Sequence, residues 1–389
     1  MPSTDARAAR IPGLTRAIGL MSGTSLDGID AALMDTDGAG IVRRGASLSI
    51  PYTIEDRLVL ATALEAAKGW DADAPMPSEV AEAERLLTLS HVLAVKKLLK
   101  KAKLRPSDVD LVGFHGQTVL HAPALRRTVQ IGMGDVLARL TGIDVVNDFR
   151  SADVAAGGEG APLVPLYHRA LVAGAGLGQP VALINIGGVS NVTFIGANGA
   201  GEAWDEAEGG LLAFDTGPGN ALIDDWAMRH KGEPVDWDGA LAASGRVDEG
   251  ALARLLDHPF FDQPPPKSLD RFSFSPDAVA HLSAADGAAT LTAFTAAAIA
   301  RAVRLMPQAP ARLIVCGGGR HNPVLMEALR RASNITVEKA EDRGWRGDDI
   351  EAEAFAYLAV RAKKGLPLSL PATTGVPEPM RGGRFHTAG

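Results

Sequence analysis

The sequence predicts an α/β protein built from two similar domains. Apolar runs of strand length alternate along the chain with stretches of helical periodicity, which is typical of α/β layering. Two hairpin-like segments begin at residues 17 and 181, and each consists of an apolar run, a turn rich in small residues and a second apolar run. A repeat at the length of one domain indicates two like-folded halves, and 389 residues are enough for them.

The individual elements follow from this pattern. The apolar runs lie at 17–21 and 29–34 in the first hairpin, and at 181–186 and 192–195 in the second. A third glycine turn follows an apolar strand and precedes a helix that Pro323 can begin. The remaining expectations are strands at 110–114, 128–131 and 144–148, helices at 221–229, 324–332 and 348–364, and an extended segment at 366–379.

Composition and charge narrow the classes of function. Hydrophobic residues make up 46% and charged residues 22% of the chain, so it can bury cores. A net charge of −7 is unlike the basic surface of a nucleic-acid-binding protein. A single cysteine, Cys316, allows no intrachain disulfide and fits a reducing compartment. No apolar run is long enough for a signal peptide or a transmembrane helix, so we expect a cytoplasmic protein without a membrane partner.

Three turns rich in glycine follow apolar strands, and they are candidate binding elements. Without side chains, their backbone N–H groups can approach a phosphate closely, and serine or threonine hydroxyls add donors. Tight turns also need glycine for structural reasons alone, so one such turn would be weak evidence. Neither a P-loop pattern nor a dinucleotide-binding pattern occurs at these turns. Three turns at domain spacing therefore favour a nucleotide held between two domains.

The motif FDTGPGN at 214–220 contains the sharpest catalytic candidate. Asp215 ends a short apolar run and precedes a rigid turn and a helix. A carboxylate at the end of a strand is well placed to act as a general base. An aspartate there can equally cap the turn or the helix, and the residues alone leave both interpretations open.

His115 and Gln117 follow a predicted strand and have more than one interpretation. They form a hydrogen-bonding turn, or they contact a substrate. A metal pair of His115 with His121 is the weaker reading, because no third ligand is evident.

Other polar residues lie beside stiff or glycine-rich segments. Arg150 and Asp153 precede a turn with three glycines, and they bind a polar substrate or form a salt-bridged corner. The segment 264–268, which contains Lys267, is a stiff loop end or a polar clamp.

Together these motifs resemble those of the 1,6-anhydro-N-acetylmuramic acid kinases, which belong to the superfamily of sugar kinases, actin and heat-shock chaperone ATPases. The resemblance covers nearly the whole chain. It rests on ordered blocks at 19–30 (GLMSGTSLDGID), 115–118 (HGQT), 129–132 (VQIG), 141–146 (TGIDVV), 148–150 (DFR), 153–165, 185–191 (NIGGVSN), 214–220 (FDTGPGN) and 315–319 (VCGGG).

This resemblance implies the architecture. It predicts an α/β, actin-like (ribonuclease H-like) duplicated two-domain fold with a nucleotide cleft between the domains. We expect one domain at 1–145, a second with sugar and adenosine contacts at 146–365, and a C-terminal segment at 366–389. A return of that segment to the first domain stays open.

The resemblance also assigns roles to residues. Asp215 matches the family's catalytic base, and Glu351 falls at the position of a second carboxylate near the reacting water. The nucleotide would contact two phosphate loops and an adenosine turn: Gly23, Thr24, Ser25, Leu26, Asp27, Gly28, Ile29 and Asp30; Gly187, Gly188, Ser190 and Asn191; Gly317, Gly318, Gly319 and Asn322. The sugar would contact His115, Gln117, Arg150, Asp153, Gly217, Asn220 and Lys267.

Two positions depart from the family's pattern. Glu159 stands where the family usually has a glutamine, which adds a charge to that turn. Met21 stands where many superfamily kinases carry an aspartate in the first phosphate loop. The magnesium ligands therefore cannot be assigned by analogy, and Asp27 and Asp30 are candidates.

The expected function is an ATP- and Mg²⁺-dependent kinase that hydrolytically opens and phosphorylates 1,6-anhydro-N-acetylmuramic acid, in peptidoglycan recycling and amino-sugar metabolism. Its partner would be this small sugar, and the sequence is compatible with a homodimer. Two alternatives remain. An actin-like assembly or chaperone module would share the glycine hairpins but has no need for Asp215 in this motif, and a kinase of an ordinary hexose or amino sugar is excluded only by the resemblance.

Overall fold

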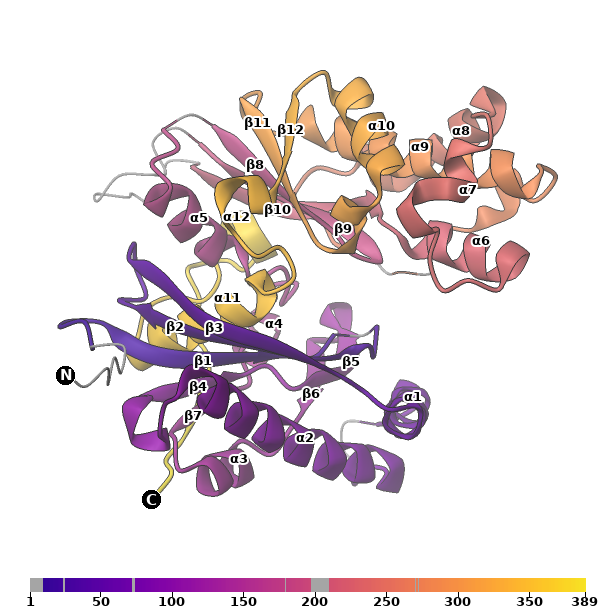
Figure 1. Cartoon of the computed structure of the whole chain (residues 1–389). Coiled ribbons are helices and arrows are strands. Elements are labelled where there is room, and N and C mark those ends of the chain that lie inside the picture. The colour runs from indigo at the N-terminus through magenta and orange to yellow at the C-terminus, as the bar shows by residue number, and fades with distance from the viewer. Residues whose placement is uncertain are drawn as a thin grey trace, which may run out of the picture. The chain divides into compact units, whose positions relative to one another are not determined.

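The computed structural model describes residues 10–389 except 24, 72–73, 179, 197–209, 270 and 272. These residues form two compact units (Figure 1). Unit 1 contains the described residues up to Gly174, together with Asp349–Pro371 and Val376–Gly389. Unit 2 contains Ala175–Asp348 and Ala372–Gly375. The division differs from the expected boundaries at 145 and 365, because residues 146–174 and 349–365 pack with unit 1.

The sheet of unit 1 has six strands in the order β13-β7-β4-β1-β2-β3. The first three strands in the chain are antiparallel to one another, whereas β4 and β7 continue the sheet in parallel with β1. Strand β13 closes the edge by pairing with β7 in the antiparallel sense. The bounds are β1 (Thr15–Met21), β2 (Gly28–Thr36), β3 (Val42–Pro51), β4 (Leu111–Phe114), β7 (Val145–Asn147) and β13 (Arg384–His386).

The sheet of unit 2 repeats this arrangement. Its order is β10-β9-β8-β11-β12, with an antiparallel meander of three strands followed by two strands parallel to β8. Because both sheets have the chain order 3-2-1-4-5, the predicted α/β duplicated, actin-like fold is confirmed. The bounds are β8 (Val181–Ile186), β9 (Val189–Ile195), β10 (Leu211–Pro218), β11 (Arg312–Cys316) and β12 (Thr336–Lys339).

Helices cover the sheets of both units (Figure 1). In unit 1 they are α1 (Ile54–Lys68), α2 (Ser78–Ala102), α3 (Gly134–Thr141), α4 (Ser151–Ala155), α5 (Pro165–Gly174) and α11 (Ile350–Lys363). In unit 2 they are α6 (Ala221–Lys231), α7 (Ala240–Ala243), α8 (Glu249–Leu256), α9 (Ala284–Val303) and α10 (Pro323–Ser333). Helix α10 begins as expected, with Pro323 in its first turn and the Asn322 side chain accepting from the N–H groups of Val324 and Leu325.

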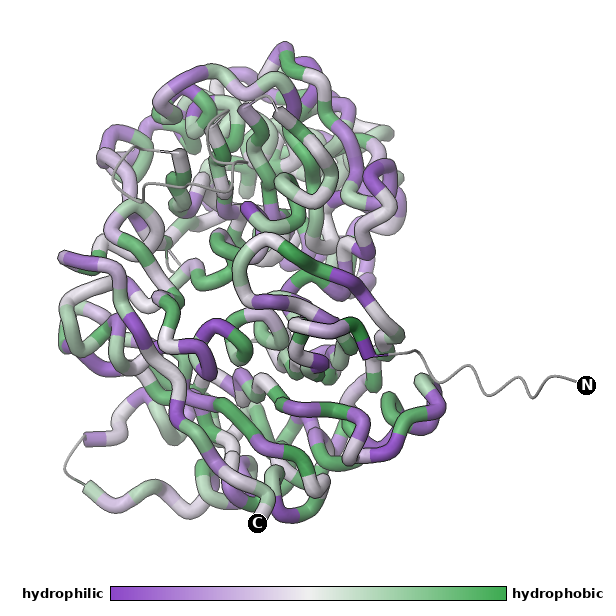
Figure 2. Tube along the Cα trace, turned by 90° about the vertical axis from the view of Figure 1, so that its left-hand side faces the viewer, coloured by the Kyte–Doolittle hydropathy of each residue, from purple (hydrophilic) through white to green (hydrophobic). Residues whose placement is uncertain are grey.

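Each unit has its own buried core, and in Figure 2 hydrophobic residues gather toward the inside of each unit. Alternation along β1 explains how helices cover both faces of the first sheet. Ile18 and Leu20 join the core that includes α2, so Gly19 between them faces the other side. There the backbone of α11 comes so near that a Cβ on Gly19 would lie 1.8 Å from the carbonyl oxygen of Ala352. This close approach is the reason that α11 belongs to unit 1.

Two expected elements differ in detail. The segment 366–379 is not wholly extended, because α12 (Pro371–Thr374) forms within it, beginning at a proline that suits a first helical position. The expected strand at 128–131 is β6 (Arg127–Ile131), which pairs with β5 (Gln117–Ala122) in a separate two-stranded sheet. Within the described ranges, no helix has both the length and the apolar character needed to cross a membrane.

The packing of α11 on Gly19 yields a prediction about stability. Gly19→Ala places a methyl group against the helix backbone, and such overpacking costs about 1–3 kcal/mol or more of unfolding free energy. Gly40→Ala is the control, because no atom lies within 4 Å of a Cβ there. Urea denaturation should show a lower midpoint for Gly19→Ala only. Equal midpoints for the two variants would contradict the packing described here.

Candidate functional site

The second and third glycine turns lie at one edge of the sheet of unit 2. Strands β8 and β11 are parallel neighbours, with Asn185 opposite Cys316, so the turns that follow them emerge side by side. Strand β10 runs in the same direction as β8, so the FDTGPGN motif ends at this edge too. Asn220 links the motif to the second turn, because its N–H donates to Gly187 O (2.7 Å) and its side-chain Nδ2 donates to Ile186 O (3.2 Å).

The predicted binding glycines separate into two groups by the space around them. Hypothetical Cβ atoms on Gly23, Gly187, Gly188 and Gly318 would meet no atom nearer than 3.5 Å. Packing within the protein therefore does not require glycine at these four positions, and each of the three turns contributes at least one of them. This open space is what close approach of a phosphate or a sugar ring to the backbone needs.

The other glycines of the turns are required by the fold itself. A Cβ would lie 2.2–2.4 Å from protein atoms at Gly28, Gly219, Gly317 and Gly319, and 2.9 Å from Ala298 at Gly217. Gly217 and Gly317 also have positive φ angles, of 144° and 73°. The structural interpretation of the glycine turns thus holds at these five residues, and the binding interpretation stays a prediction for the four glycines with open space.

Asp215 lies at a β-bulge near the end of β10. The pairing with β9 shifts between Asp215 and Gly217, and a bulge of this kind re-aims a side chain relative to the sheet. The backbone N–H of Asp215 donates to Lys267 O (2.9 Å), and its Oδ2 accepts from the N–H of Leu269 (2.7 Å). The segment 267–269 therefore holds the carboxylate in one orientation.

The Lys267 side chain turns toward the interior of unit 2. Its ammonium donates to Phe260 O (2.8 Å) and lies 4.3 Å from the centre of the Phe260 ring. Burial lowers the pKa of Lys267, and Asp262 opposes this shift. Of the two interpretations of the proline-rich segment, the stiff loop end has the direct geometric support, and contact of Lys267 with a sugar stays a prediction.

In unit 1, the buried His115 and the half-buried Arg150 form a hydrogen-bonded pair. Arg150 Nε donates to His115 Nε2 (3.0 Å), and Nδ1 of the same ring lies 2.8 Å from Gly116 O. A ring that accepts at Nε2 carries its proton on Nδ1, so His115 is neutral. Burial, and then the positive charge of Arg150, hold the pKa of His115 well below its usual range. The metal reading of His115 with His121 has no support, because these two bonds already occupy both ring nitrogens of His115.

Arg150 also organises the turn that follows it. Its Nη1 donates to Gly160 O (2.6 Å), and Asp153 Oδ1 accepts from the Gly160 N–H (2.7 Å). The other oxygen of Asp153 accepts from Ser369 Oγ. Burial lowers the pKa of Arg150 to about 10, while Glu351 and Asp153 act in the opposite direction. Arg150 is therefore a half-buried cation that keeps its charge at neutral pH.

Acidic residues gather around the loop between β1 and β2. The pKa of Asp30 is raised to about 6, mainly by burial and in smaller part by the neighbouring charges of Asp27, Asp349 and Glu351. Ser49 opposes the shift through a hydrogen bond of 2.5 Å to Asp30 Oδ1. In the described part of the chain, no three His, Cys, Asp or Glu side chains form a metal cage. Mg²⁺ usually takes one or two carboxylates plus phosphates and water, so Asp27 and Asp30 fit it as candidates.

The other predicted nucleotide contacts have varied surroundings. The Ser190 hydroxyl is fully buried and has no hydrogen-bond partner among the described residues, and the Asn322 side chain caps α10. Asn191 lies opposite Asp215 in the sheet. In the first loop, Ser25 donates to Asp27 Oδ1 (2.9 Å) and Leu26 has a positive φ of 55°. Ile29 is buried in β2, and Thr24 lies outside the described residues.

Several residues that hold these groups were not among the predicted site residues. Ser22 donates to Gln117 Oε1 (2.7 Å) and lies 2.8 Å from the hydroxyl of Tyr52. Ser369 holds Asp153 from more than two hundred residues away. Such contacts depend on the fold: Tyr52 and Ser369 stand in no motif, and Ser22, although it lies in the block at 19–30, has its partners Tyr52 and Gln117 in other segments.

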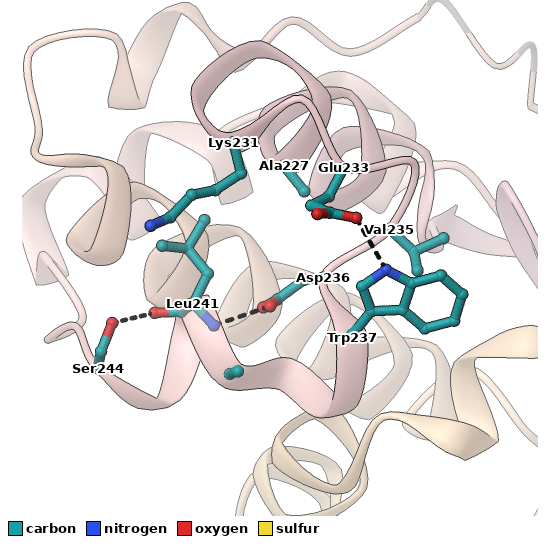
Figure 3. A pocket seen from close by; sticks show the side chains of 9 residues that line it. Ala227, Lys231, Glu233, Val235, Asp236, Trp237, Leu241 and Ser244 are labelled. Carbon is teal, nitrogen blue, oxygen red and sulfur yellow. Dashed lines mark hydrogen bonds between the residues drawn. The ribbon is translucent and has the colours of Figure 1, made fainter.

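A separate pocket of about 320 Å³ lies in unit 2 (Figure 3). Trp237 is exposed at its rim, where the indole Nε1 donates to Glu233 (3.1 Å). None of the predicted site residues lines this pocket; its lining is Ala227, Lys231, Glu233, Val235, Asp236, Trp237, Ala240, Leu241 and Ser244.

The fold and the turns define the class of protein: an actin-like α/β protein in which glycine turns follow the strands of two like-folded units. A family model described as "Anhydro-N-acetylmuramic acid kinase" matches residues 15–387. Proteins of that name from Rhizorhabdus wittichii and Nitrobacter winogradskyi are 55% and 53% identical, over 95% and 94% of this chain and 98% of each relative. A solved activator of the 2-hydroxyisocaproyl-CoA dehydratase from Clostridium difficile has a TM-score of 0.44 and 13% identity, over 90% of this chain and 96% of its own.

The chain belongs to the anhydro-N-acetylmuramic acid kinase family. The resemblance found in the sequence is thereby confirmed, and so is the prediction of a kinase. An assembly or chaperone module of the same fold is not favoured.

The open space at Gly188 leads to a prediction about nucleotide binding. In Gly188→Ala the new methyl group meets only Ala221, at 3.8 Å, so the unfolding free energy should stay within about 0.5 kcal/mol of wild type. A phosphate that approaches this backbone would meet the methyl group, and affinity for an ATP analogue should fall roughly tenfold, which is about 1.4 kcal/mol. Calorimetric titration measures both this variant and the control Gly178→Ala, whose Cβ would meet nothing within 4 Å. Unchanged affinity in folded Gly188→Ala would remove Gly188 from the site.

Proposed function

We propose that this chain uses ATP and water to convert 1,6-anhydro-N-acetylmuramic acid to N-acetylmuramate 6-phosphate, with ADP as the second product. The observation that carries this is the orientation of Asp215, whose Oδ2 is held by the Leu269 N–H at the edge where the glycine turns emerge. Membership of the family supports the choice of sugar.

The chemistry explains why the reaction needs a base that acts on water. In the anhydro sugar, O6 is bonded to C1, so there is no hydroxyl to phosphorylate until that bond breaks. Asp215 takes a proton from water, the resulting hydroxyl adds to C1, and the bond between C1 and O6 breaks. The freed O6 then takes the γ-phosphoryl group of ATP. Asp215 is the general base in this scheme, and Glu351 is a second carboxylate near the water.

Positioning of the sugar would come from groups that are already held in place. The Arg150 guanidinium and the neutral His115 ring form a rigid pair, and Asp153 fixes the turn beside them through Gly160. Such a prearranged set costs little reorganisation when a polar ligand binds. Gln117, Gly217, Asn220 and Lys267 complete the proposed sugar contacts.

The nucleotide would occupy the three glycine turns. The backbone N–H groups of the first two turns would approach the phosphates, and the third turn, Gly317–Gly319, would lie against the adenosine. Asp27 and Asp30 would hold Mg²⁺ together with the phosphates. When bound, the ion supplies positive charge that offsets the charge of the transferring phosphoryl group.

Its cellular setting follows from the substrate, which is a fragment of peptidoglycan. The reaction would return that fragment to amino-sugar metabolism. A cytoplasmic location fits the use of ATP and the single buried thiol of Cys316.

Replacing Asp215 distinguishes a role as general base from a role as a structural cap of the turn or helix. Asp215→Asn keeps the size and can still accept the Leu269 N–H, so the melting temperature should hardly change. The amide cannot take a proton from water, and turnover should fall about 10²–10⁴-fold. Asp248→Asn is the matched control, because Asp248 caps α8 with a bond to the Ala251 N–H (2.6 Å). Early melting of Asp215→Asn with normal turnover per folded molecule would assign Asp215 to a structural role.

Isotope labelling tests the reaction itself. In oxygen-18 water, with the anhydro sugar and ATP, the label should enter C1 of the sugar phosphate, because water supplies the new oxygen there. The transferred phosphoryl group should carry none, because its bridging oxygen is O6 of the sugar. Since the free hemiacetal exchanges with solvent, the product is reduced at early times before mass spectrometry.

Two outcomes of this experiment would contradict the proposal. An unlabelled C1 at early times would mean that water does not open the ring. Label in phosphate, with no sugar phosphate formed, would mean that the protein hydrolyses ATP instead.

A further inference from the structure

Tyr52 occupies a place in unit 1 that the reaction scheme does not use. It follows the last residue of β3, Pro51, and precedes Thr53, which caps α1. The side chain is 6% exposed and packs in the core of unit 1. Its position is therefore fixed both by a helix cap and by the core.

Tyr52 makes hydrogen bonds to both ends of the loop between β1 and β2. Its backbone N–H donates to the carbonyl oxygen of Asp27 (3.1 Å), which is the last residue before β2. Its phenol oxygen lies 2.8 Å from the hydroxyl of Ser22, which is the first residue after β1. One residue thus fixes the width of the loop proposed to hold phosphate.

The hydroxyl of Ser22 extends this contact to another segment. Ser22 Oγ lies 2.7 Å from Oε1 of Gln117, a fully buried side chain at the start of β5. A carbonyl oxygen has no proton to give, so the single proton of Ser22 points to Gln117. The Ser22 oxygen must then accept, and the phenol of Tyr52 donates.

Two observations support this direction of the chain of hydrogen bonds. Burial raises the pKa of the Tyr52 phenol, so it keeps its proton across the whole neutral range. The flipped orientation of the Gln117 amide is disfavoured, because in the present orientation Nε2 donates to the carbonyl oxygen of Thr118 (3.4 Å). Tyr52 therefore donates to Ser22, and Ser22 donates to Gln117, which is proposed to contact the sugar.

We propose that Tyr52 is a positioning residue: it holds the first phosphate loop at both ends and, through Ser22, couples that loop to the Gln117 segment. The inference rests on the proposed function, because the loop and Gln117 are assigned there to nucleotide and sugar. Loss of the phenol proton donor leaves the buried Ser22 oxygen without a donor, and such a loss is worth about tenfold in an equilibrium constant.

The test compares Tyr52→Phe with a matched control. Tyr357→Phe also removes one buried hydroxyl from unit 1, in this case a donor to Ala39 O (2.7 Å). Calorimetry measures the Kd of a non-hydrolysable ATP analogue, and the Kd of the anhydro sugar with and without that analogue. In Tyr52→Phe the analogue should bind about 3- to 10-fold more weakly, and the ratio of the two sugar Kd values should move toward one. Both quantities should stay at wild-type values in Tyr357→Phe.

A double-mutant cycle makes the result independent of one variant. Ser22→Ala removes the middle of the chain and should reproduce the effect of Tyr52→Phe, and the two changes together should add nothing further. Equal loss of binding in Tyr357→Phe, additive effects in the cycle, or a sugar ratio that Tyr52→Phe does not change would each overturn the proposal.

Failure of the proposed function gives a different result. If wild-type protein binds the ATP analogue but forms no sugar phosphate, the reaction is wrong, while the analogue Kd of the variants still decides the role of Tyr52 at the loop. If wild-type protein does not bind the analogue, the loop does not hold phosphate and the proposal for Tyr52 is overturned with it.

Discussion

The structure depends on one constraint: where strands run in the same direction, the segments that follow them leave the sheet at the same edge. In unit 2, β8, β10 and β11 all end at one edge, so residues that are far apart in the sequence emerge together there. Asn220 ties two of these exits by its bonds to Ile186 and Gly187. The tight packing of Gly219 and Gly319 then leaves Gly188 and Gly318 with open space at the same edge. The topology of the sheet thus places the two glycine turns and the FDTGPGN motif at one edge, independently of their side chains.

The two units solve different electrostatic problems. In unit 1 the half-buried guanidinium of Arg150 donates to the neutral ring of His115, and the negative charges of Glu351 and Asp153 act on the same cation. His115 orients the guanidinium without forming an ion pair with it. In unit 2 an anion, Asp215, is held by a backbone N–H, which fixes its direction without adding a charge. In both units a neutral group contributes to the orientation of a charged one.

Much of this could be predicted from the sequence, because the relevant signals are local. Apolar runs, glycine turns and Pro323 predicted the repeated strands, the turns and the start of α10 correctly. The short helix α12 was missed because four residues have no periodicity to read. Ser22, Tyr52 and Ser369 could not be found, since their partners lie in other parts of the chain. The sequence also could not show which glycines are required by packing and which have open space around them, because that depends on their neighbours in three dimensions.

The contact of α11 with the first sheet sets a mechanical limit. A helix that packs through side chains can slide over a sheet as those side chains change rotamer. Here backbone meets backbone at Gly19 and Gly113, where added atoms would lie 1.8 Å and 2.1 Å from carbonyl oxygens of α11. A shift of the helix by one residue, about 1.5 Å along its axis, would move its backbone away from the space that the two glycines leave for it. Glu351 lies in the first turn of α11. By fixing the helix along its axis, the two glycines therefore also fix the position of this carboxylate.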